Sequence, residues 1–81
     1  MDDQSLYPDE AISTLLGVEG LPGEARGQLE QALGGSYAVR CTALHLVLKG
    51  LPQGARHSMT AEQLSVVSLG GIAAAEALAD R

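Results

Sequence analysis

Apolar residues recur along the chain at the three- and four-residue spacings that place side chains on one face of an α-helix. The most regular stripe lies in the middle of the chain, where the successive spacings are +4, +3, +4 and +3. Shorter stripes precede and follow it, so the pattern predicts a chain built from amphipathic helices. The regular stripe consists of Tyr37, Cys41, Leu44, Leu48 and Leu51.

Prolines, glycines and one capping motif mark the expected helix boundaries. Pro8 suits the first position of a helix, where its missing N–H costs nothing, and Pro22 suits the same position in a second helix. Between them, Gly20 suits the residue that follows a helix, because glycine readily adopts a positive φ. Thr60 and Gln63 have the spacing of a capping box, which predicts that the last helix begins there.

The stretch GLPGEAR at residues 20–26 recurs as GLPQGAR at residues 50–56. Each copy lies between two apolar stripes, and the triplet LGG follows at 33–35 and again at 69–71. This pattern predicts a single all-α domain over residues 1–81, a small bundle of three to four short helices in two antiparallel hairpins. The recurrence has two interpretations, an internal duplication or repeated helix punctuation in a chain rich in Leu, Gly and Ala.

Three segments need separate interpretation. We expect residues 1–5 to form a flexible tail ahead of the first helix. Residues 37–49 also suit a β-strand, but their regular stripe and the lack of a second convincing strand favour a helix. Gly70 and Gly71 each lower helix stability by about 1 kcal/mol relative to alanine. They either break the last helix or mark a place where it approaches another helix closely.

The composition indicates a small apolar core and a tendency to self-associate. The chain has 81 residues, and its aromatic side chains are two tyrosines, with no Phe or Trp. A core of leucine and alanine favours closely packed helices, and a domain of this size often gains stability by oligomerising. Small residues four apart in the last helix suit a close contact, either inside the bundle or between two copies. We therefore expect a homodimer seam formed by Leu64, Val67, Gly71, Ala75 and Leu78.

Charge is unevenly distributed along the chain. The formal net charge is −5, and residues 1–30 hold seven of the ten acidic side chains. The simpler interpretation is a solvated surface that keeps the protein soluble. The alternative is an acidic inhibitor or regulator that blocks a basic surface of a partner protein, for example one that binds nucleic acid. The mildly basic middle of the chain would complement the acidic region within the fold or between copies. The acidic surface would comprise Asp2, Asp3, Asp9, Glu10, Glu19 and Glu24.

No motif in the chain is typical of an enzyme or of a cofactor site. Cys41 and His45 share one helix edge, but a metal site needs further ligands and a nucleophilic cysteine needs a cleft. We therefore expect Cys41 to be a core residue. The five Lys and Arg are too few and too scattered to favour direct nucleic-acid binding. The lone cysteine and the absence of a leader or of about 20 consecutive apolar residues predict a cytoplasmic protein with no membrane contact.

The sequence thus predicts a small, non-enzymatic protein–protein interaction module that needs no cofactor or metal. It would self-associate through apolar helix faces as a homodimer, bind another protein, or do both. The acidic regulator is the alternative function.

Overall fold

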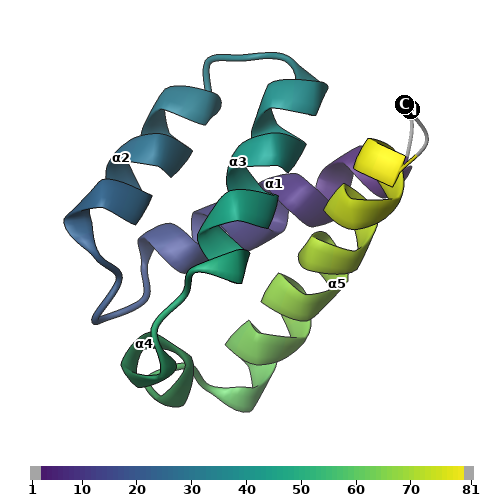
Figure 1. The fold of residues 1–81 in the computed structure, drawn as a ribbon. Helices are drawn as coiled ribbons and strands as arrows, with labels where there is room; N and C mark the ends of the chain where they lie inside the picture. Colours follow the sequence, from purple (N-terminus) through teal and green to yellow (C-terminus); the bar gives the residue numbers. More distant parts are fainter. Residues whose placement is uncertain (1–2, 80–81) are drawn as a thin grey trace.

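The chain forms five α-helices in a computed structural model that describes residues 3–79 (Figure 1). No β-strand occurs in this part of the chain, so the all-α prediction is confirmed, including a helix over residues 37–49. The expected number of three to four helices is too low, because a five-residue helix is too short to show an amphipathic repeat. The helices are α1 (Asp3–Leu16), α2 (Gly23–Ala32), α3 (Tyr37–Lys49), α4 (Gln53–His57) and α5 (Ala61–Ala79).

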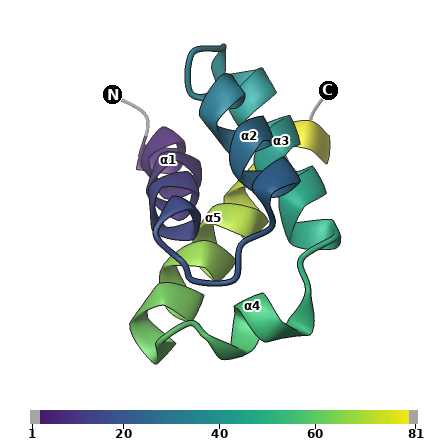
Figure 2. The same ribbon diagram turned by 90° about the vertical axis from the view of Figure 1, so that its left-hand side faces the viewer.

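The first helix packs mainly against the last one. α5 contacts α3 as well, and α3 in turn contacts α2. In Figures 1 and 2, α2 and α3 lie side by side, and α4 lies at the end of the molecule where the chain passes from α3 to α5. α1 makes only a small contact with α2. This differs from the expected first hairpin, in which α1 and α2 would be each other's main partners.

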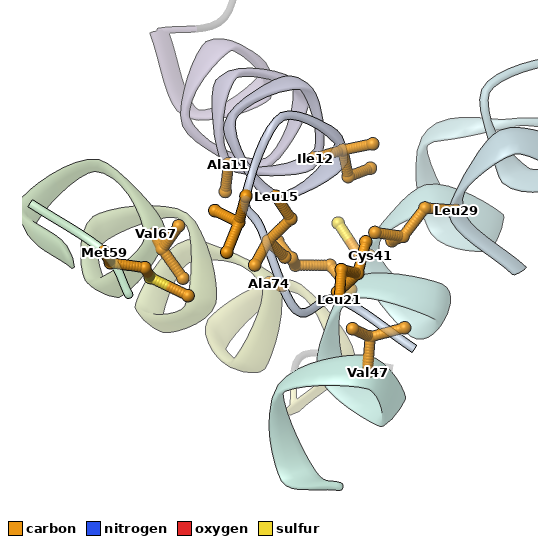
Figure 3. Close-up of a cluster of buried hydrophobic side chains, with 12 residues drawn as sticks. Ala11, Ile12, Leu15, Leu21, Leu29, Cys41, Val47, Met59, Val67 and Ala74 are labelled. Carbon is orange, nitrogen blue, oxygen red and sulfur yellow. The ribbon is translucent and has the colours of Figure 1, made fainter. Parts of the chain in front are cut away.

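The core collects side chains from α1, α2, α3 and α5 around the middle of the molecule (Figure 3). Ile12 and Leu15 of α1, Leu29 of α2, and Cys41 and Leu44 of α3 are fully buried. The prediction that Cys41 is a core residue is therefore confirmed. No buried side-chain nitrogen or oxygen in the described part of the chain lacks a hydrogen-bond partner.

Pro8 does not start α1. The helix already begins at Asp3, and Pro8 lies inside it with its ring fully buried. The expectation from the proline pattern is therefore wrong here. A proline in the second turn of a helix removes one intrahelical hydrogen bond, but the apolar ring of Pro8 contributes to the core. Residues 3–5 of the expected tail belong to α1, and residues 1 and 2 lie outside the described residues.

Side-chain caps begin α3 and α5. The Val39 N–H donates to Ser36 Oγ at 3.3 Å, at the start of α3. At the start of α5, the Thr60 N–H donates to Gln63 Oε1 at 2.9 Å and the Gln63 N–H donates to Thr60 Oγ1 at 3.1 Å. The predicted capping box is thus confirmed. α5 then continues without interruption through Gly70.

The two copies of the recurring stretch start their helices in the same way. Pro22 has φ −59° and ψ 148°, and Pro52 has φ −66° and ψ 151°. The glycines that precede them differ, because Gly20 has a φ of +88° whereas Gly50 has a φ of −101°. Gly20 thus has the expected positive φ, but it does not directly follow the first helix, because α1 ends four residues earlier at Leu16. The second copy reaches its proline through a different turn.

Candidate functional site

A groove of about 630 Å³ lies between α3, α4 and α5. Its floor is apolar and includes Leu48 of α3, Met59 and Val67. Met59 and Val67 also belong to the buried core, so residues of the core form part of the groove floor. We call this feature the α3–α5 groove. It can accept apolar side chains from another molecule without exposing a buried polar group of this one.

The α5 wall of the groove exposes large apolar side chains. Leu64 is 38% exposed and Ile72 is 58% exposed, and both line the groove. Ser68 lies between them on the same wall, Ala75 follows Ile72 along the helix, and both are exposed. The α5 wall therefore presents two large apolar side chains, Leu64 and Ile72, to the solvent beside the groove.

Four of the five residues expected in a homodimer seam line this groove: Leu64, Val67, Gly71 and Ala75. They are not equivalent, because Val67 is only 5% exposed and forms part of the core. Leu78, the fifth, is half-buried and packs against the core outside the groove lining. The sequence pattern did not select Ile72, although it lies eight residues after Leu64 and therefore on a nearby line of the same helix.

The small residues of α5 serve two different contacts. A Cβ on Gly70 would overlap Ala11 Cβ and come within 2.6 Å of the carbonyl oxygen of Tyr7, so α1 approaches the α5 backbone closely there. Ala74, one turn later, is also fully buried. Gly71 faces the groove instead, where a Cβ would come within 2.8 Å of Leu48 Cδ1. Close packing inside the bundle therefore occupies Gly70 and Ala74, and leaves Gly71 and Ala75 in the groove.

Basic side chains form one rim of the groove. His45 and Lys49 of α3 and Arg56 of α4 line it, and no acidic residue does. Two other arginines are engaged within the fold, where Arg26 donates to the carbonyl oxygen of Leu16 at 2.7 Å and Arg40 donates to Asp9 Oδ1 at 2.7 Å. Within residues 3–79, the side chains of Lys49 and Arg56 make no hydrogen bond or ion pair, so both positive charges are available at the rim.

Acidic side chains lie on the side of α5 that faces away from the basic rim of the groove. Glu62, Leu69 and Glu76 are seven residues apart, which places them on one line along the helix. Leu69 is 49% exposed and both glutamates are exposed. The exposed surface of α5 is therefore an apolar strip between a basic rim on α3 and α4 and an acidic line on α5 itself.

The residues of the alternative acidic surface are dispersed over several elements. Asp2 lies outside the described residues, and Asp3 is the first residue of α1. Asp9 is ion-paired with Arg40, which also donates to the carbonyl oxygen of Gly35 at 2.7 Å. The acidic residues Glu10, Glu19 and Glu24 are exposed. The expected complementarity between acidic and basic regions thus occurs within the fold at Asp9, which removes one member from a free acidic face.

The described residues present no metal site. Cys41 is fully buried whereas His45 is exposed on the groove rim, and no three His, Cys, Asp or Glu side chains of residues 3–79 gather as metal ligands would. None of the helices described here has the length and apolarity that crossing a membrane requires. A second groove, of about 670 Å³, lies on α2 and α3 and is lined by uncharged residues such as Gln28, Thr42 and Leu46.

Comparison of the chain with protein families, curated proteins and solved structures gives no match.

Proposed function

We propose that the chain is a small helical-bundle protein of the cytoplasm that acts as a protein–protein interaction module, without enzymatic activity, and that it self-associates as a homodimer through the α3–α5 groove. The observation that carries this proposal is the groove itself, an apolar depression that reaches the core and is bordered by the exposed side chains of Leu64 and Ile72. Burying such side chains in an interface contributes about 25 cal/mol per Å² of apolar surface.

The size of the chain favours the same conclusion. A domain of 81 residues buries a smaller fraction of its surface than a larger domain, so its stability margin is small. Three of the exposed large apolar residues, Leu64, Leu69 and Ile72, belong to α5 alone. A second copy that covers them would add to the apolar area that supports the fold.

The test is the absolute mass of the untagged protein by light scattering, over a hundredfold range of concentration and at two salt concentrations. We expect a dimer whose mass changes little with salt, because apolar contacts are not screened. A monomer at every concentration contradicts the proposal. A monomer would instead favour the alternative function, an acidic regulator. Its affinity for a basic partner should fall steeply as the salt concentration increases.

A matched pair of variants locates the interface. Ile72 in the groove is 58% exposed and Leu46, which lines the second groove, is 55% exposed. We expect Ile72→Gln to raise the dimer dissociation constant by about tenfold or more, because the apolar contact is lost twice in a symmetric dimer. Leu46→Gln should leave the dissociation constant unchanged. Equal effects of the two variants would show that the groove is not the interface.

A further inference from the structure

Symmetry limits how two copies of the chain can pack through the α3–α5 groove. The arrangement inferred below presupposes the homodimer proposed above. Two identical chains that meet through the same surface are related by a twofold axis that lies in the interface. If that axis ran across α5, the two helices would be antiparallel and stacked, and neither groove would be filled. If it runs along α5, the helices are parallel and side by side, and each lies in the groove of the other copy.

Charge favours the parallel arrangement. The surface has a basic rim on one side, formed by Lys49 and Arg56, and an acidic line on the other, formed by Glu62 and Glu76. An axis along α5 exchanges the two sides, so the acidic line of one copy faces the basic rim of the other. An axis across α5 keeps each side in place, so that like charges meet and repel.

The positions of the charged residues along the axis of α5 indicate which acidic residue of one copy meets which basic residue of the other. α4 ends at His57 and α5 begins four residues later at Ala61, and the views show α4 near the start of α5 (Figures 1 and 2). Arg56 of α4 and Leu64, in the second turn of α5, line the same groove, which places Arg56 near the first turns of α5. Glu62 lies in the first turn of α5. In a parallel pair the first turns of the two α5 helices are level with each other, and Glu62 of the second copy is therefore level with Arg56.

We infer that two copies of this chain pair their α5 helices in parallel, each α5 lying in the α3–α5 groove of the other copy, with Glu62 of one copy opposite Arg56 of the other. The apolar strip of α5 supplies the area of contact, and the charged edges determine the direction of the helices. Arg56 and Glu62 are both exposed in the single chain, so substitutions there leave the core intact, and the dissociation constant reports their effect on the pair.

Charge reversal tests the contact between Arg56 and Glu62. Arg56→Glu and Glu62→Arg should each raise the dimer dissociation constant by about tenfold or more, because each places like charges opposite one another at two symmetric contacts. The double variant should bring it back to within about threefold of the wild-type value. Glu30→Arg, at an exposed position of α2, is the control and should have no effect. If the losses of dimer affinity add in the double variant instead of cancelling, Arg56 and Glu62 are not opposite each other, and the inferred contact is wrong.

Disulfide cross-linking tests the direction of the helices. Ala61 and Ala75 lie on one line of α5, fourteen residues apart. A disulfide requires the two Cα atoms to be within about 7 Å, which a parallel pair provides at both positions. An antiparallel pair that brings one position opposite its copy separates the other by about 42 Å. We therefore expect Ala61→Cys and Ala75→Cys, made separately, both to form covalent dimers under mild oxidation.

The wild type is the control for cross-linking, because its only cysteine is fully buried. A wild type that remains monomeric would overturn the proposed function and this inference together. A dimeric wild type in which only one of the two cysteine variants cross-links, or neither does, would overturn the parallel arrangement and leave the proposed function standing.

Discussion

At the scale of single residues, two adjacent glycines of α5 have different roles. Gly70 lies against the backbone of α1, where a Cβ would meet the carbonyl oxygen of Tyr7 at 2.6 Å. Gly71 lies in the α3–α5 groove, where a Cβ would meet the end of the flexible Leu48 side chain at 2.8 Å. A backbone carbonyl cannot move aside without disturbing α1, whereas a leucine methyl can rotate away. The two positions therefore differ in their tolerance of a methyl group.

We expect Gly70→Ala to lower the free energy of unfolding by about 2 kcal/mol, since the overlap costs more than the gain in helix propensity. Gly71→Ala should leave it unchanged or raise it by up to about 1 kcal/mol. Urea denaturation of both variants at one low protein concentration measures the difference. Equal values for the two variants would show that α1 does not approach α5 closely at Gly70.

The sequence alone indicated that Gly70 and Gly71 suit close contacts, but not that Gly70 contacts α1 and Gly71 lies in the groove. Both are small residues with an alanine four positions later, and the pattern suits a contact inside the bundle as well as one between copies. The choice depends on which side of α5 faces α1, and that is determined by tertiary packing. Cys41 was predictable as a core residue, because it belongs to the most regular apolar stripe of the chain.

At the scale of elements, short-range signals were reliable. The capping box of Thr60 and Gln63 joins residues only three positions apart, so the sequence contains the whole interaction. α4 was missed because it has only five residues. The start of α1 was misplaced because Pro8 is buried inside the helix, which a rule about helix starts does not anticipate.

The capping box of α5 gives a prediction for helix stability. Thr60→Ala removes the acceptor of the Gln63 N–H and should lower the free energy of unfolding by about 1 kcal/mol. Thr42→Ala is the control, because Thr42 lies inside α3 and its hydroxyl donates only to the carbonyl oxygen of Ala38. Its removal should be neutral or slightly stabilising. Thermal unfolding followed by circular dichroism measures both, and an unchanged midpoint for Thr60→Ala would contradict the role of the cap.

The recurring stretch gives a second prediction at this scale. The arginine of the first copy, Arg26, donates to the carbonyl oxygen of Leu16 and thereby satisfies the last residue of α1. The arginine of the second copy, Arg56, makes no such bond within the described chain. We expect Arg26→Ala to cost about 1 kcal/mol of unfolding free energy. Arg56→Ala, measured by urea denaturation where the protein is monomeric, should stay within about 0.5 kcal/mol of the wild type.

At the scale of the whole molecule, the all-α class was predictable and the pairing of helices was not. Apolar stripes on four helices indicate that each must be covered, but they do not say by which neighbour. α1 and α5 are the most distant helices in the chain and nevertheless form its largest contact. The candidate site was found only in part for the same reason. Leu64 and Gly71 were predictable from α5 alone, whereas the basic rim depends on where α3 and α4 lie.

Self-association should make the stability of the molecule depend on its concentration. A dimer that unfolds to two chains is stabilised by mass action, so we expect the melting temperature to rise by about 5–10 °C over a hundredfold increase in protein concentration. Differential scanning calorimetry at several concentrations measures this. Ile72→Gln should show a weaker dependence than the wild type. A melting temperature that is the same at all concentrations would contradict a dimer stabilised by the groove.

The fully buried Cys41 has a practical consequence for measurements of this kind. The chain has one cysteine, and a thiol-alkylating reagent can reach it only when the bundle opens. The rate of alkylation in the native protein, divided by the rate in the unfolded chain, therefore reports the population of the open state without denaturant. The same reading can be taken from unlabelled protein at nanomolar dilution or inside a living cell, where scattering and calorimetry do not reach.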